Sequence, residues 1–170
     1  CLVGSEMCIR DRGGPQLPAS ITVDSLGSWT DFVGDEYKAF SGTAVYTTTI
    51  NKVPVADVIK LDLGSVAENA SVYLNGDYIG TVIDSPYQLY IPAEKFKGQD
   101  ELVVRVANSM ANRIAYMDKK GVDWKIFYNV NMSARKKENV KNGIFDASDW
   151  EPKSSGLLGP VTLTPAMVKQ

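Results

Sequence analysis

The sequence contains no histidine in 170 residues. A Ser-His-Asp triad or a Cys-His pair is therefore excluded, because both need an imidazole as the general base. The phosphate-binding patterns GxxxxGK[ST] and GxGxxG are also missing. Glycoside hydrolysis needs two placed carboxylates, but 20 acidic residues make their mere presence uninformative. We expect no catalysis by this chain alone, and no cofactor.

Cysteine is almost absent. Cys1 and Cys8 both lie in the first twelve residues, CLVGSEMCIRDR, which lack the basic start and apolar core of a signal peptide. This segment resembles a translated sequencing-library adapter fused to a truncated reading frame, so we interpret residues 1–12 as non-native. The natural domain then has no cysteine, and neither a disulfide framework nor a cysteine metal site is expected. A genomic read that encoded the segment in place would contradict this interpretation.

Long apolar runs and a strong charge of one sign are missing as well. No apolar run approaches the length of a membrane-spanning helix. The net charge of -2 gives no reason to expect nucleic acid or a membrane as a partner. Hydrophobic content of 44% and charged content of 22% are ordinary for a globular protein. We expect a linker at 13–20, rich in Gly and Pro, and a single domain at 21–170.

What the sequence does contain is apolar and polar residues in alternation, chiefly between residues 57 and 108. The alternating apolar positions are Ile59, Leu61 and Leu63, then Val72 and Leu74, then Leu102, Val104 and Val106. This period of two predicts half-buried strands, and the interspersed Gly and Pro predict turns. We expect an all-β antiparallel sandwich with further strands at 21–23, 44–50 and 161–163.

The dipeptide Asn75-Gly76 predicts a two-residue type I′ hairpin, because such a turn needs positive φ at both central residues. The predicted pairs are Leu74 with Asp77, Tyr73 with Tyr78, Val72 with Ile79, and Ser71 with Gly80. Val72, Leu74 and Ile79 should then face the core, since opposed residues share a face. Tyr73 and Tyr78 should lie on the other face, with Gly80 leaving room beside them.

The segments LDLGSVAENASVYLNGDYIGT and ELVVRVAN resemble the galactose-binding-like, sugar-binding jelly roll of large bacterial glycoside hydrolases. The similarity is to β-galactosidase-type enzymes and, more closely, to α-L-rhamnosidases. FSGTA upstream and GLLGPV near the end extend it to residues 29–165. The resemblance implies a jelly roll and a catalytic domain elsewhere in the same parent chain. It also implies a secreted or periplasmic location, and we expect this chain to be the C-terminal piece of a longer protein.

Asn108, Asn112 and Arg113 match a segment of the rhamnosidase-like enzymes in which Asn is followed, after three residues, by Asn-Arg. A nearby Asp follows in those enzymes, but Asp118 lies one residue further along, so its role is not carried over. An Asn-Arg pair can fix backbone carbonyls or bind sugar hydroxyls. We favour the structural role, because the planar fork of Arg often ties a loop to strand ends.

Residues 119–152 form a long excursion that should contain structure of its own or act as an ordered lid. Trp124, Tyr128 and Trp150 could stack on a sugar ring, since Trp and Tyr combine an apolar face with a polar edge. Packing against the sandwich is the alternative, and we expect it for at least two of the three. The candidate carbohydrate contacts are Asn108, Asn112, Arg113, Trp124 and Tyr128.

Residues 29–41 are predicted to be a polar, aromatic loop whose Asp31, Asp35 and Glu36 raise the question of calcium. Their spacing fits no calcium loop, and calcium prefers six to eight oxygen ligands. We therefore interpret them as solvated carboxylates, and a structural calcium ion has no motif to support it.

Three functions remain compatible with the sequence. The chain could be an accessory domain of a glycoside hydrolase that packs on the catalytic domain, with Tyr73 and Tyr78 marking the interface. It could be an independent carbohydrate-binding module that contacts oligosaccharide, or a β-sandwich interaction module without a sugar role. A bare apolar surface favours the first, and an exposed coplanar aromatic pair favours the second. We rank them in this order.

Overall fold

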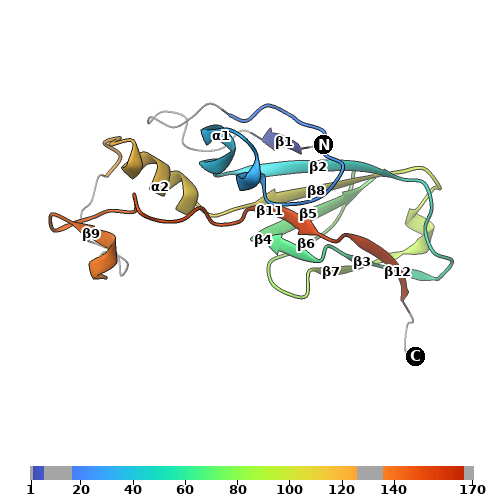
Figure 1. Ribbon diagram of the computed structural model, residues 1–170. Helices are drawn as coiled ribbons and strands as arrows, with labels where there is room; N and C mark the ends of the chain where they lie inside the picture. Colours follow the sequence, from blue (N-terminus) through green and yellow to red (C-terminus); the bar gives the residue numbers. More distant parts are fainter. Residues whose placement is uncertain (1, 6–16, 126–135, 167–170) are drawn as a thin grey trace.

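The computed structural model describes residues 2–5, 17–125 and 136–166. Antiparallel strands form two packed layers, and an insertion projects from one end of the sandwich (Figure 1). The prediction of an all-β sandwich is confirmed. The helices described are α1 (Asp35–Lys38) and α2 (Ala111–Lys119), with short 3-10 turns η1 (Trp29–Asp31), η2 (Ala93–Lys95) and η4 (Lys137–Asn139).

The larger layer is a five-stranded sheet in the order β1-β2-β8-β5-β6. Its strands are β1 (Leu2–Ser5), β2 (Thr43–Ile50), β8 (Asp100–Ala107), β5 (Asn69–Leu74) and β6 (Asp77–Val82). Strand β1 comes from the segment that we interpret as non-native. The predicted first strand at 21–23 is reduced to a single β-bridge residue, Ile21, whose partly buried side chain packs against the core.

The second layer is a three-stranded sheet in the order β12-β3-β7, extended by the pair β11-β4. Its strands are β12 (Thr162–Ala166), β3 (Val58–Asp62), β7 (Gln88–Pro92), β11 (Gly156–Gly159) and β4 (Ser65–Ala67). A small hairpin of β9 (Val140–Lys141) and β10 (Ile144–Phe145) belongs to the insertion. After this hairpin the chain runs back to the sandwich and enters β11 (Figure 1).

The core lies between the two layers and uses the alternating residues that the sequence predicted. Leu61, Val72 and Val106 are fully buried. Alternate residues along the same strands, two positions away, belong to the same hydrophobic cluster. The segment predicted as a polar, aromatic loop at 29–41 contains the short turns η1 and α1, and its aromatic side chains contribute to the core. Trp29 and Phe40 are buried and pack edge to face, with ring centroids 5.4 Å apart. Asp31, Asp35 and Lys38 of this segment are exposed, while Trp29 and Phe40 close the core.

The hairpin follows the predicted register for two pairs and then departs from it. Asn75 and Gly76 have φ of 53° and 87°, as a type I′ turn requires. A bulge at Ile79 then places Val72 opposite Gly80 rather than Ile79. Gly80 therefore belongs to the core side, where an added Cβ would lie 2.9 Å from the Leu89 side chain. Its predicted place on the outer face was wrong.

The predicted distribution of side chains over the two faces of the hairpin is otherwise confirmed. Val72 and Leu74 are buried, and the partly buried Ile79 packs against the same core. Tyr73 and Tyr78 meet on the outer face, with ring centroids 5.5 Å apart.

Candidate functional site

Ser155 is the centre of the junction between the sandwich and the insertion. Its side chain is buried, and its backbone N–H donates to Ser28 Oγ at 2.9 Å. Its carbonyl accepts from the N–H of Trp29 at 3.1 Å. Its hydroxyl donates to Lys153 O at 3.1 Å and accepts from Asn108 Nδ2 at 3.1 Å. The returning chain is thus bonded both to the end of β8 and to the segment that closes the core.

Asn108 and Asn112 use their amides within the protein. Asn108 Nδ2 donates to Phe40 O at 2.9 Å, and its Oδ1 accepts from the N–H of Gly42 at 3.0 Å. The buried Asn112 exchanges two hydrogen bonds of 2.8 Å with the backbone of Lys153. The amide groups of both residues therefore fix backbone segments, which is the structural role that we favoured from the sequence.

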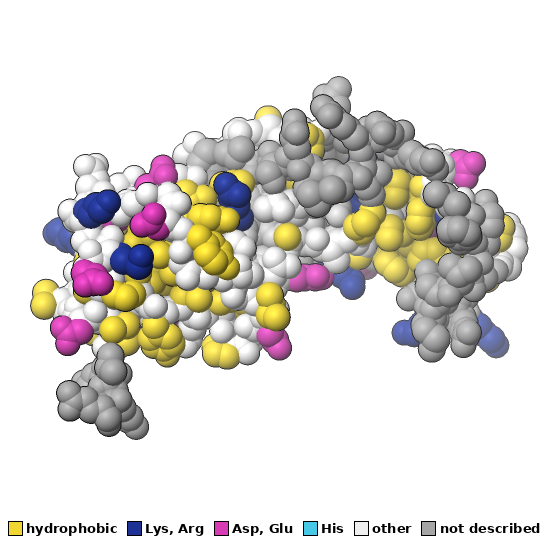
Figure 2. Space-filling model, turned by 180° about the vertical axis from the view of Figure 1, so that it is seen from behind, with side chains coloured by type: hydrophobic (Ala, Val, Ile, Leu, Met, Phe, Trp, Pro, Cys, Tyr) yellow, Lys and Arg dark blue, Asp and Glu magenta, His cyan; other side chains and the backbone are white. Residues whose placement is uncertain are grey.

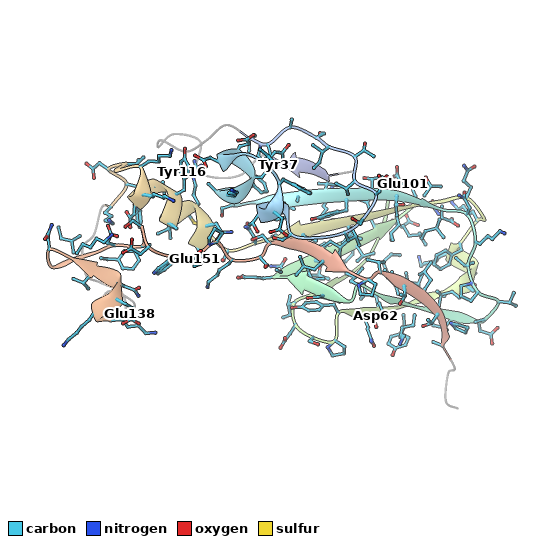
Figure 3. All side chains as sticks on the ribbon, viewed as in Figure 1. Tyr37, Asp62, Glu101, Tyr116, Glu138 and Glu151 are labelled. Atoms are coloured by element: carbon cyan, nitrogen blue, oxygen red, sulfur yellow. The ribbon has the colours of Figure 1, made fainter. Side chains whose placement is uncertain are left out.

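Arg113 behaves differently from its neighbour Asn112. Its side chain is half-buried, yet the structure records no ion pair or hydrogen bond between it and any residue in the described ranges. Burial lowers the pKa of the Arg113 guanidinium, against a smaller opposing effect from nearby Tyr116. Arginine stays protonated even so. A partly desolvated cation, without a carboxylate partner among the residues that the structure describes, therefore lies on α2, the helix that also carries Tyr116 (Figure 3).

The insertion has a small core of its own, organised by Asp118. The carboxylate is 1% exposed; its Oδ1 accepts from Trp124 Nε1 at 2.7 Å and contacts Lys125 Nζ at 2.7 Å. Its Oδ2 accepts from the N–H of Ala147 at 2.8 Å. Trp124 packs with Phe145 in the same cluster. Asp118 thus connects α2 to both ends of the insertion, a role that the sequence did not indicate.

Two of the three candidate stacking residues pack inside the insertion rather than against the sandwich, where we expected them. Trp124 is held by Asp118. Trp150 donates from Nε1 to Asn139 Oδ1 at 2.9 Å and packs edge to face on Phe145. Tyr128 lies outside the described residues. The neighbouring junction at Ser155 was also missed, because isolated serines carry no sequence signal that distinguishes a buried junction from a turn.

A second polar and aromatic surface lies on the outer face of the five-stranded sheet. We call it the tyrosine–arginine patch; it comprises Ser71, Tyr73, Tyr78, Thr81 and Arg105. The Arg105 guanidinium stacks 4.8 Å from the centre of the Tyr73 ring. The Tyr78 hydroxyl bonds Thr81 Oγ1 at 2.8 Å, and Thr81 bonds Ser71 at 2.8 Å. Arg105 has no carboxylate partner within the described ranges.

The acidic residues that the sequence raised for calcium are placed apart from any metal-like cluster of described residues. Asp35, one of the three carboxylates considered for calcium, forms an ion pair with Lys120 at 3.3 Å. Within the described ranges, no group of three or more His, Cys, Asp or Glu side chains is placed to hold a metal ion. In the same part of the chain, no helix has the length and apolar character needed to cross a membrane.

Sequence and structure comparisons match the chain to short segments of much longer proteins. No family model matches it. A curated relative, a putative beta-glucuronidase of Formosa agariphila, is 34% identical over 158 residues, which cover 84% of this chain and 14% of the relative. The solved rhamnosidase from Novosphingobium sp. PP1Y shares 30% identity with a TM-score of 0.65, over 91% of this chain and 13% of that one.

A GH2 beta-galacturonidase from Eisenbergiella tayi is more distant, at 22% identity and a TM-score of 0.45. The chain spans about one seventh of the length of the Formosa relative and of the Novosphingobium rhamnosidase. The resemblance stated from the sequence is confirmed at this level. The chain corresponds to one β-sandwich segment of large glycoside hydrolases, and a rhamnosidase is among its structural relatives.

Proposed function

We propose that this chain is a non-catalytic accessory domain of a secreted, α-L-rhamnosidase-like glycoside hydrolase, and that it packs against the catalytic domain of the same parent chain. The observation that carries the proposal is the match of 91% of this chain to 13% of a rhamnosidase. Most of that enzyme lies outside the matched segment, which leaves ample length for a separate catalytic domain.

The carboxylates of the chain agree with a non-catalytic role. A general acid or nucleophile must reach the substrate, but Asp118 and Asp100 are buried and accept hydrogen bonds from the protein itself. The labelled acidic residues Asp62, Glu101 and Glu138 lie on separate parts of the sandwich and the insertion (Figure 3). This distribution supports assigning the paired carboxylates of glycoside hydrolysis to another domain.

The tyrosine–arginine patch is the surface that we assign to docking. Tyr78 is 59% exposed, and Tyr and Arg are the side chains that most often dominate interface energetics. Arg105 already covers one face of the Tyr73 ring, so that face is not free to stack on a sugar. The stacked guanidinium is instead ordered and able to accept a carboxylate from the catalytic domain. Hydrophobic side chains also gather on the surface of the sandwich and of the insertion (Figure 2).

A direct contact with carbohydrate is the second candidate, and Arg113 is the observation that favours it. Its half-buried guanidinium lacks a partner in the described part of the chain and could donate to sugar hydroxyls. The amides of Asn108 and Asn112 and the indole N–H of Trp124 are already engaged. A weak sugar site would therefore depend on Arg113, through helix α2, which the domain would contribute to the catalytic cleft.

Activity measurements test the proposal. The isolated chain should release no chromophore from an aryl α-L-rhamnoside or an aryl β-D-glucuronide, whereas the parent enzyme, expressed from the recovered gene, should cleave the rhamnoside. Calorimetry with plant-type oligosaccharides should give weak heat that Arg113→Ala abolishes, or none if the domain is purely structural. Turnover by the isolated chain would overturn the proposal. The parent gene should also encode an export signal.

A further inference from the structure

Three side chains lie in a row along one face of α2: Arg113, Tyr116 and Lys120, the last at the end of the helix. They are three and four positions apart, and residues at this spacing are neighbours on a helix surface. The Lys120 ammonium lies 5.5 Å from the centre of the Tyr116 ring. Arg113 and Tyr116 are partly buried, whereas Lys120 is exposed. A partly shielded phenol thus has one cation before it and one after it along the helix.

This face of α2 is turned away from the core of the insertion. Ile114 and the carboxylate of Asp118 are engaged within that core, on the other side of the helix. Toward α1, Lys120 Nζ lies 3.3 Å from Asp35 Oδ2. The labelled Tyr116 and the helix α1 lie along the same upper edge of the molecule (Figure 3). The row is therefore placed where the insertion meets the end of the sandwich.

The charges of this row do not balance. Asp35 pairs with Lys120, and because both side chains are more than half exposed this pair is weak. Arg113 has no carboxylate partner among the residues that the structure describes. Partial burial of a cation without a counter-charge costs free energy, and a neutral hydroxyl does not offset that charge. The group that best completes the site is therefore an anion.

The two side chains at the start of the row indicate which anion fits. Arg113 presents a planar fork, and paired N–H groups of this kind match the two oxygens of a carboxylate. One turn along α2, the Tyr116 hydroxyl has no hydrogen-bond partner in the same described ranges and can both donate and accept. A uronic acid carries a carboxylate and neighbouring hydroxyls on one ring. The carboxylate of a protein side chain would use the guanidinium alone.

We propose that Arg113 and Tyr116 form a binding site for a uronic acid residue of an oligosaccharide. Arg113 holds the carboxylate through two hydrogen bonds, and Tyr116 bonds a neighbouring ring hydroxyl. Lys120 adds positive potential to the same face. The inference rests on the sugar contact that we proposed for Arg113, and it names the class of sugar. A neutral oligosaccharide is the poorer ligand, because it leaves the charge of Arg113 uncompensated.

Matched pairs of sugars test this site on the whole 170-residue chain. Trigalacturonate and triglucuronate are each compared with their methyl esters, which keep the sugar rings and remove the charge. NMR titrations follow the side-chain Nε–H resonance of Arg113 and the backbone amides of α2, so that weak binding is measured at the site itself. At least one acid should shift these resonances and bind about tenfold or more tightly than its ester, which corresponds to about 1.4 kcal/mol.

Three variants locate the effect. Arg113→Gln keeps an apolar stem but removes the charge, so it should abolish the preference for the acid. Arg113→Lys keeps the charge without the fork and should retain only part of that preference. Lys119→Ala is the matched control, because it removes a cation from the same helix at an exposed position outside the row. It should leave the affinity within about twofold at physiological salt, where exposed charges are screened.

Thermal melting verifies that each variant folds. The inference is overturned if the esters bind as tightly as the acids, if Arg113→Gln keeps the preference, or if Lys119→Ala weakens binding as much as Arg113→Gln. It is also overturned if neither acid shifts the resonances of α2. None of these results bears on docking, which a titration against the remainder of the parent enzyme measures separately. Turnover of a glycoside by the isolated chain would overturn the proposed function without changing the ratio of acid to ester affinity.

Discussion

Asn112 and Lys153 hold each other through two hydrogen bonds of 2.8 Å, one from Asn112 Nδ2 to Lys153 O and one from the Lys153 N–H to Asn112 Oδ1. The two residues lie 41 positions apart, at the start of α2 and on the returning chain. One buried amide therefore closes the base of the insertion and keeps it joined to the sandwich.

Removing this amide should destabilise the domain. Asn112→Ala leaves the backbone N–H of Lys153 without its partner, while Lys153 O keeps the bond from the Ser155 hydroxyl, so we expect a loss of about 1–3 kcal/mol in unfolding free energy. Urea denaturation measures the change. Asn51→Ala, at an exposed position, is the control and should stay within about 0.5 kcal/mol of wild type. An Asn112→Ala protein with wild-type stability but lost sugar binding would show that this residue binds a ligand.

The two faces of the hairpin should respond differently to truncation. Leu74 is 2% exposed, and Leu74→Ala should lower the free energy of unfolding by about 2–5 kcal/mol. Tyr78 is 59% exposed, and Tyr78→Ala should cost less than about 1 kcal/mol in the isolated domain. Denaturant titrations of both variants measure the difference. A larger loss for Tyr78→Ala would mean that the assignment of faces is wrong.

Gly156 should tolerate no side chain. Its φ is +115°, and an added Cβ would meet the Tyr46 hydroxyl and lie 2.9 Å from Trp29 Cε3. Gly156→Ala therefore combines backbone strain with a clash in the core, and we expect a loss of about 3 kcal/mol or more. Gly27→Ala is the matched control, because a Cβ there meets nothing within 4 Å. Equal melting temperatures for the two variants would contradict this account of the core.

Asp100 should contribute stability that depends on pH. Burial alone would raise its pKa, but hydrogen bonds from the Asn75 side chain and from the N–H groups of Lys97 and Gly98 lower the pKa overall. A lowered folded-state pKa stabilises the protein above the unfolded value of about 3.9. That contribution is lost as the pH falls through the folded value.

Asp100→Asn should therefore destabilise the domain more at pH 7 than at pH 3, as measured by urea denaturation at both values. Asp57→Asn, at an exposed carboxylate, serves as the control and should show little difference at either pH. A difference between Asp100→Asn and wild type that grows as the pH falls would contradict the direction of the pKa shift.

The sequence predicts those parts of the fold that local pattern decides. Alternation identifies Leu61, Val72 and Val104 as core residues, and Asn75-Gly76 identifies the turn. The bulge at Ile79 is not predictable in this way, because the side of the sheet that Gly80 occupies depends on Leu89 from another strand.

The candidate site was harder to predict for the same reason. Ser155 bonds Ser28 across 127 positions, and no local pattern records such a contact. Residue type alone also cannot tell whether Trp124 faces solvent or the carboxylate of Asp118. The family resemblance located the segment at residues 108–113, but the structure was needed to separate the engaged amides from Arg113, for which the described part of the chain offers no partner.

The most direct test of the accessory-domain proposal is a calorimetric titration of this chain into the remainder of the parent enzyme, expressed from the recovered gene as a separate polypeptide. The account predicts saturable, single-site binding that Tyr78→Ala and Arg105→Ala each weaken at least tenfold, or about 1.4 kcal/mol. Tyr90→Ala is the matched control, because Tyr90 is 62% exposed and lies on β7 in the other layer; it should leave the affinity unchanged. Absence of binding, or an equal loss for Tyr90→Ala, would contradict the account.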